Sequence, residues 1–167
     1  LNDVEIQYIV DNLFIGNKLS TAQLVTSDGV RIDLRNIRSP ILVFCSYGDN
    51  ITPPPQALGW ITDLYRNDLD VLGHDQTIVY ATHDSIGHLG IFVSGSVGRK
   101  EHQEFAANID IIDVLPAGIH HMQIDEHPDP VQEGDPTSDV FLTRIRRSSI
   151  DEVREIVRPD PENDRRF

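Results

Sequence analysis

The spacing of apolar residues along the chain changes between helical and extended periods, as in a mixed α/β protein. Near the start, apolar residues recur at helical spacing and Gly16 follows them, which predicts a helix over about residues 3–15. Val30, Ile32 and Leu34 then alternate with polar residues, which predicts a short extended segment. The N-terminal part is therefore expected to contain one amphipathic helix and one short extended piece.

A strand, a helix and a second strand are expected next. Residues 41–45 are five apolar residues between a proline and a Ser-Tyr-Gly-Asp turn, which is typical of a strand buried on both faces of a parallel sheet. The three prolines at 53–55 fit only a helix entrance, and apolar residues carry that helix to about residue 67. Residues 76–81 form the second strand. This order predicts a βαβ unit with parallel strands.

The rest of the chain predicts a further helix and an antiparallel pair of strands. Residues 99–115 resemble an amphipathic helix, and alternation returns at 120–124 and 141–145 across a polar loop. Residues 149–157 are expected to form a terminal helix, and residues 159–167 a disordered tail.

Length, charge and cysteine content exclude several classes of function. The 167 residues correspond to one domain, and the 14 basic against 27 acidic residues give a net charge of −13. That sign disfavours nucleic acid and anionic membranes as partners. No apolar run reaches the roughly 18 residues of a membrane span. A lone cysteine fits a reducing, cytoplasmic location, and no nucleotide-binding or calcium-binding motif is present, so no cofactor is expected.

Asp49 is the first candidate for chemistry. It follows Gly48 directly after the first buried strand, and functional groups gather at the carboxyl ends of parallel strands. It also precedes a helix N-terminus, whose dipole favours a carboxylate. The alternative is that Asp49 only caps the turn with its side chain, as aspartate does in many such loops.

His88 is the second candidate. It lies between small residues after the next strand, where a carboxylate on one ring nitrogen would leave the other to act as general base. The alternative is a histidine that is hydrogen-bonded within a loop. Together, Asp49 and His88 follow the order of the acid and base arms of the α/β-hydrolase triad, and adjacent strand ends would let them meet.

Other constellations in the chain are less specific. His83, Asp84 and His88 suggest a zinc site, but their spacing does not place the two histidines on one helix face. Residues 94–98 lack the first glycine of a nucleophile elbow. Cys45 belongs to a buried strand and is interpreted as a core residue rather than a thiolate. The sequence therefore contains a candidate acid and a candidate base, but no segment with the pattern of a catalytic nucleophile.

Three segments of the chain resemble a known enzyme family. Residues 33–41, 48–53 and 87–93 are similar to the last third of poly(3-hydroxyalkanoate) synthases, and closer still to bacterial proteins called poly(3-hydroxyalkanoate) synthetase-like. The resemblance implies an α/β-hydrolase fold with Asp49 as triad acid and His88 as base. It also implies a hydroxyacyl thioester or ester as substrate, and a cysteine nucleophile upstream of residue 1.

These observations predict an α/β fold that is the C-terminal portion of an α/β-hydrolase, extended by a small β-hairpin and helix. The expected division is a hydrolase-like part at 1–124, an acidic extension at 125–158 and the tail at 159–167. The chain alone is expected to be inactive, and to form a homo-oligomer that covers a free sheet edge. The competing hypothesis is a non-catalytic binding or oligomerisation module in which Asp49 and His88 only pack loops. A hydrogen bond of about 2.6–3.2 Å between them, with the other imidazole nitrogen facing a cleft, would favour the catalytic site. Side chains far apart, or a buried imidazole bonded on both nitrogens, would favour the module.

Overall fold

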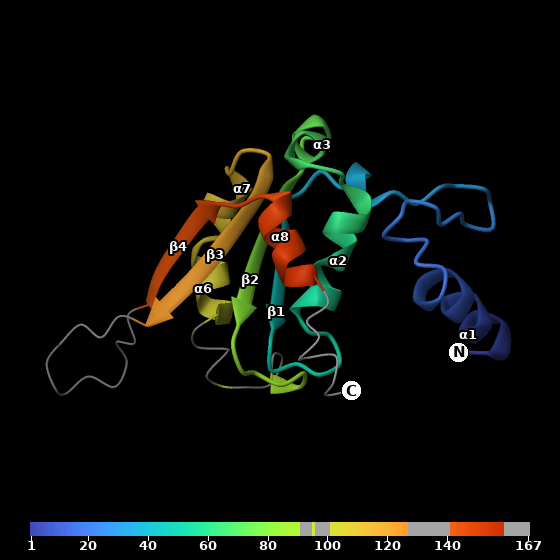
Figure 1. Cartoon of the computed structure of the whole chain (residues 1–167), viewed down its shortest axis with the longest axis horizontal. Coiled ribbons are helices and arrows are strands. Elements are labelled where there is room, and N and C mark those ends of the chain that lie inside the picture. Colours follow the sequence, from blue (N-terminus) through green and yellow to red (C-terminus); the bar gives the residue numbers. More distant parts are fainter. Residues whose placement is uncertain (91–94, 96–100, 127–140, 159–167) are drawn as a thin grey trace, which may run out of the picture.

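The fold is built on one four-stranded sheet. A computed structural model describes residues 1–90, 95, 101–126 and 141–158. The sheet has the order β1-β2-β3-β4 (Figure 1). Its strands are β1 (Ile41–Ser46), β2 (Thr77–His83), β3 (Gly118–Glu126) and β4 (Phe141–Arg147). β1, β2 and β3 run parallel, and β4 is antiparallel to β3. The chain is therefore a mixed α/β protein with a mostly parallel sheet.

Helices cover both faces of this sheet. They are α2 (Pro54–Leu64), α3 (Asp68–Gly73), α6 (Gln103–Ala107), α7 (Ile109–Asp113) and α8 (Ile150–Val157). α2 and α8 lie on one face and α6 and α7 on the other (Figure 1). The N-terminal helix α1 (Asp3–Ile9) continues into the π-helical turn η1 (Val10–Phe14), contains no buried residue and stands apart from the sheet (Figure 1).

Alternation along β2 divides the apolar core into two layers. Ile78 and Tyr80 pack with α2 and α8, whereas Val79 and Ala81 pack with α6 and α7. All four side chains are almost completely buried, as expected for a central parallel strand. α2, which lies between β1 and β2, and α6 and α7, which precede β3, therefore cover opposite faces of the sheet.

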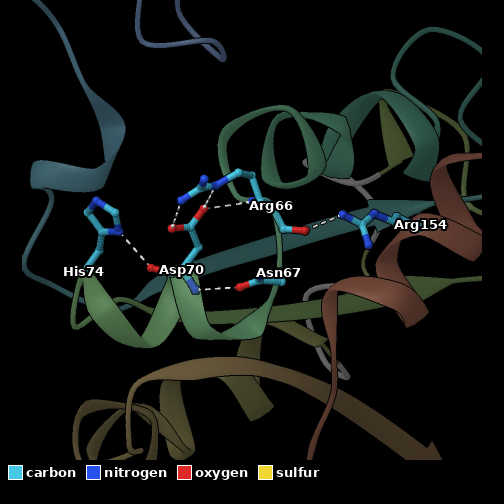
Figure 2. Close-up of polar contacts among 5 residues, drawn as sticks. All are labelled: Arg66, Asn67, Asp70, His74 and Arg154. Atoms are coloured by element: carbon cyan, nitrogen blue, oxygen red, sulfur yellow. Dashed lines mark hydrogen bonds and ion pairs between the residues drawn. The ribbon is translucent and has the colours of Figure 1, made fainter.

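A polar cluster fixes α8 against the turn between α2 and α3 (Figure 2). The Arg66 guanidinium binds the Asp70 carboxylate at 2.9 Å, and this hydrogen bond is the largest cause that lowers the pKa of Asp70 to about 2. The Asn67 side chain caps α3 by accepting from the Asp70 N–H, and the His74 ring donates to the Asp70 carbonyl at 2.7 Å. From α8, Arg154 donates to the Arg66 carbonyl at 2.6 Å. The cluster lies before β2 begins, at the amino end of the strands.

The structure confirms the α/β class and most of the expected elements. The two strands, the helix between them, the antiparallel pair and the terminal helix all occur close to their expected positions. Residues 118–121 of β3 also pair in parallel with residues 77–80 of β2, and this pairing was not predicted from the sequence. The sheet thus holds three parallel strands rather than two, and β4 belongs to the same sheet.

Two sequence expectations are wrong in detail. The extended piece at residues 30–34 forms only an isolated bridge between Val25 and Arg31, and the chain then enters the 3-10 turn η2 (Leu34–Asn36). The Asp33 side chain accepts from the Arg35 N–H, which favours a turn over a strand.

The helix expected over residues 99–115 is divided at Asn108, whose side chain donates to the Glu104 carbonyl and ends α6. The expected tail at 159–167 and the segment 94–98, apart from Gly95, lie outside the described residues. Across the part of the chain that the structure describes, no helix has the length and apolarity needed to span a bilayer.

Candidate functional site

The loops that follow β1 and β2 bring Asp49 and His88 together. Ser46 and His83 are partners in the register of the two parallel strands, so both loops leave the same edge of the sheet side by side. Asp49 lies on the first loop and His88 on the second. The His88 Nδ1 and Asp49 Oδ2 atoms are 2.9 Å apart, which is hydrogen-bonding distance. The two residues therefore meet as their positions after adjacent strands predicted, while their catalytic role stays a prediction.

The two carboxylate oxygens of Asp49 bind different groups. Oδ1 accepts from the backbone N–H groups of Ile51 and Thr52, at 2.8 and 3.0 Å. Oδ2 accepts from the Thr52 hydroxyl at 2.7 Å and faces the His88 ring. Asp49 thus caps its own turn with one oxygen and holds the histidine with the other. The turn cap expected for Asp49 uses Oδ1, and the contact with His88 on which the acid–base hypothesis depends uses Oδ2.

The surroundings of Asp49 keep its carboxyl ionised. Its side chain is fully buried, and burial alone would raise its pKa. Hydrogen bonds from the Thr52 N–H, the His88 ring, the Ile51 N–H and the Thr52 hydroxyl outweigh burial and place the pKa of Asp49 well below its usual range. An ionised carboxylate only accepts hydrogen bonds, so His88 donates from Nδ1.

This bond sets the tautomer of His88. With its proton on Nδ1, the neutral ring carries its lone pair on Nε2, which is the arrangement of a general base oriented by a carboxylate. The His88 side chain is 33% exposed, so the ring is partly accessible at the surface while its acidic partner is not. A carboxylate on Nδ1 would stabilise a positive charge on this ring.

Gly48 allows the two loops to approach so closely. A Cβ atom at position 48 would lie 2.3 Å from the carbonyl carbon of Ser85 and 2.4 Å from its oxygen. It would also lie 2.8 Å from the Ile86 backbone nitrogen. These are backbone atoms of the loop that carries His88, and they have little freedom to move aside. A side chain at position 48 would push the loops apart, so the glycine is required by this contact rather than by its φ angle.

Thr52 is a site residue that sequence reasoning missed. Its position before the prolines suggests a helix cap, but the N-cap of α2 is Pro53. The Thr52 hydroxyl instead donates to Asp49 and lies 3.3 Å from Nδ1 of His88. Thr52 therefore orients the carboxylate. A threonine three residues after a loop aspartate is the only sequence signal for this role, because that spacing lets a hydroxyl reach back to the carboxylate.

The described residues do not supply the remaining parts of a triad or a metal centre. Cys45 is 1% exposed, and burial raises the pKa of its thiol to about 12, so it is a core residue rather than a nucleophile. His83 points to Glu101 rather than to His88, with 3.6 Å between His83 Nε2 and Glu101 Oε1. Within the described ranges, no three histidine, cysteine or acidic side chains are placed to hold a metal ion.

Comparison with known proteins identifies a family but no chemistry. Residues 1–167 match a family described as "Protein of unknown function (DUF3141)". The chain is also similar to a Rhizobium meliloti protein described as "Uncharacterized protein in ackA 5'region", with 53% identity over 167 residues. The match covers 100% of this chain and 23% of that protein, so the chain spans about a quarter of the length of its relative. No solved structure matches.

These matches correct the resemblance to poly(3-hydroxyalkanoate) synthases. The chain matches a family of unknown function and an uncharacterised relative, neither of them described as a synthase, so the family assignment from residues 33–41, 48–53 and 87–93 is wrong. The error has a physical origin. The short Gly-Asp segment after β1 satisfies local needs, namely a close loop contact and a turn cap, which unrelated α/β proteins share. The geometry of Asp49 and His88 does not depend on that assignment.

Proposed function

We propose that this chain, which belongs to the family described as "Protein of unknown function (DUF3141)", carries the acid and base of a hydrolase-type catalytic site. Asp49 would be the acid that orients the histidine, and His88 the general base. The reaction class would be acyl transfer or hydrolysis on an ester or thioester, in which the base removes a proton from an attacking hydroxyl, thiol or water. The sheet would then be part of an α/β-hydrolase-type domain.

The observation that carries this proposal is the 2.9 Å hydrogen bond between His88 Nδ1 and the buried carboxylate of Asp49. Three further features support it. The pair lies at the carboxyl ends of adjacent parallel strands, where functional loops of open α/β sheets gather. The acid precedes the base in the chain, as in the α/β-hydrolase order. The carboxylate also keeps its charge despite burial, because four hydrogen bonds stabilise it.

In this proposal the nucleophile comes from another part of the longer protein. The matched relative is about four times as long as this chain, so a catalytic site of such a protein can draw on residues outside it. Among the described residues, Cys45 is buried and the Thr52 hydroxyl is engaged by Asp49. The chain by itself therefore supplies the proton acceptor and its orienting group.

A chimeric protein tests the proposal. This chain replaces the matching stretch of the Rhizobium meliloti protein, and turnover of p-nitrophenyl esters and of an activated thioester is measured. His88→Gln keeps a polar side chain but removes the base, and we expect turnover to fall by about 100-fold or more. His74→Gln is the matched control, because His74 lies at the amino end of β2 and bonds a carbonyl of α3.

The result that contradicts the proposal is a folded chimera whose turnover is the same with Gln at position 88 as with His. Equal losses for His88→Gln and His74→Gln would also contradict it, because they would reflect a general effect on folding. Circular dichroism of each variant establishes that the compared proteins are folded.

A second candidate function is a non-catalytic module in which the same residues hold two loops together. Asp49 Oδ1 caps the turn through Ile51 and Thr52, and Gly48 seats that turn on the backbone of Ser85. On this alternative, His88→Gln lowers stability and leaves turnover of the chimera unchanged. The same experiment therefore separates the two functions.

A further inference from the structure

A cavity lies on the face of the sheet that α6 covers, and neither Asp49 nor His88 lines it. Its volume is about 450 Å³, which is within the range of small-molecule sites. It opens where β2 and β3 approach their carboxyl ends. Its lining is mostly polar and has some apolar side chains. The apolar side chains include Phe44, Met122 and Ile124, and the polar ones include His83, Asp84 and Glu101.

The polar part of this lining contains a second histidine–carboxylate pair, formed by His83 and Glu101. Glu101 is 4% exposed, and its Oε1 lies 3.6 Å from His83 Nε2, beyond the length of an ordinary hydrogen bond. The Ser85 backbone N–H donates to His83 Nδ1 at 3.2 Å, so the neutral ring carries its proton on Nε2. The pair thus presents one donor and one acceptor to the cavity, close together but not joined by a short bond.

A hydroxyl group matches this arrangement. Its oxygen can accept from His83 Nε2–H while its hydrogen is donated to the Glu101 carboxylate, so one group satisfies both side chains. A carboxylate ligand would meet the charges of Glu101 and Asp84. An ammonium would be attracted by those charges but has no acceptor for the His83 N–H. The apolar side chains of the lining suit a short hydrocarbon segment next to the hydroxyl.

We propose that this cavity is a binding site for a small uncharged alcohol, with the hydroxyl between His83 and Glu101 and the hydrocarbon part against Phe44 and Met122. The site is independent of the Asp49–His88 pair and of any catalytic role for it. In this site Glu101 accepts a hydrogen bond from the ligand. Glu101 has no part in the candidate acid–base pair.

The test uses Met122, which is the one methionine among the 167 residues and is 1% exposed at the cavity. The Met122 methyl group is labelled with ¹³C, its NMR signal is assigned with Met122→Leu, and the chain is titrated with 1,2-hexanediol. We expect a saturable shift of this signal. Hexanoate and hexylammonium, which have a similar chain but a charged head group, are titrated in parallel and should bind more weakly.

Two variants examine the polar part of the lining. Glu101→Gln removes the charge, and His83→Asn keeps an acceptor for the Ser85 N–H while removing the ring donor. Each should weaken diol binding by about tenfold or more, the effect of losing a hydrogen bond to a charged or buried partner. Asp110→Asn, at an exposed position on α7 away from the cavity, is the control and should leave binding unchanged.

Three results would overturn the proposal. They are a Met122 signal that does not shift with the diol, tighter binding of hexanoate or hexylammonium than of the diol, and diol binding unaffected by both cavity variants. Because the measurement is binding to the chain itself, none of these results bears on ester turnover by the chimera. Failure of this site and failure of the proposed function are thus distinguished.

Discussion

Replacing Gly48 by alanine should separate the loops that carry Asp49 and His88. The new Cβ would lie 2.3 to 2.8 Å from backbone atoms of Ser85 and Ile86, so one loop must move by several tenths of an ångström or more. Overpacking against rigid atoms costs about 3 kcal/mol, the upper end of the range for such changes. The lower conformational entropy of alanine in the unfolded chain offsets about 1 kcal/mol of that. We therefore expect Gly48→Ala to lower the free energy of unfolding by about 2 kcal/mol.

Gly87→Ala is the matched control in the opposite loop. A Cβ at position 87 would meet only the Gly48 carbonyl oxygen, at an ordinary 3.9 Å. Its free energy of unfolding should be unchanged or higher by up to about 1 kcal/mol. Urea unfolding followed by circular dichroism measures both variants, and an NMR spectrum of the imidazole nitrogens reports whether His88 still binds Asp49. Equal stabilities for the two variants would refute the close packing of the loops.

Five further outcomes are expected. Asp49→Ala should lower the free energy of unfolding by about 3 kcal/mol at neutral pH, because it leaves buried donors without an acceptor. The pKa of Asp49 is lower in the folded state than in the unfolded state, so its carboxylate adds to the free energy of unfolding above its unfolded pKa of about 4. This contribution is lost as the pH falls below that value. In an acid titration, Asp49→Asn should therefore lose less free energy of unfolding than the unchanged chain. Cys45, whose thiol pKa is raised to about 12, should react with a thiol reagent only after unfolding. The chain alone should not turn over p-nitrophenyl esters, and turnover that depends on His88 would contradict this. It should sediment as a homo-oligomer, since β1 is an outer strand of the described sheet. A monomer at micromolar concentration would contradict that expectation.

The central βαβ unit and the meeting of Asp49 with His88 were accessible from the sequence. A short apolar run between a proline and a polar turn has few alternatives to a buried strand, and prolines at a helix entrance fix where that helix begins. Two parallel strands joined by a helix end at the same edge of the sheet. An aspartate and a histidine placed after those strands are therefore close for geometric reasons.

Other parts of the site depend on contacts that sequence periodicity does not encode. The hydroxyl of Thr52 reaches Asp49 only because the turn folds back on itself, and His83 faces Glu101 across separate elements. The parallel pairing of β3 with β2 is likewise a long-range contact. Local sequence signals cannot specify such partners.

The family assignment failed for a related reason. Gly48 is needed for a close contact between two loops, and Asp49 caps its own turn. These structural functions would require both residues even in a protein without enzymatic activity. A motif of this length therefore indicates a loop geometry rather than a reaction. The hypothesis of an acid–base pair depends on the contact between the two side chains in the structure and not on the motif.

The most direct test of the central claim is the tautomer of His88 in solution, observed by long-range ¹H–¹⁵N correlation NMR with labelled histidine. We predict that the neutral ring carries its proton on Nδ1, hydrogen-bonded to Asp49. Asp49→Asn should shift the proton to Nε2, since a carboxylate is what selects the Nδ1–H form. A ring that carries its proton on Nε2 in the unchanged chain, or a tautomer that does not respond to Asp49→Asn, would contradict it.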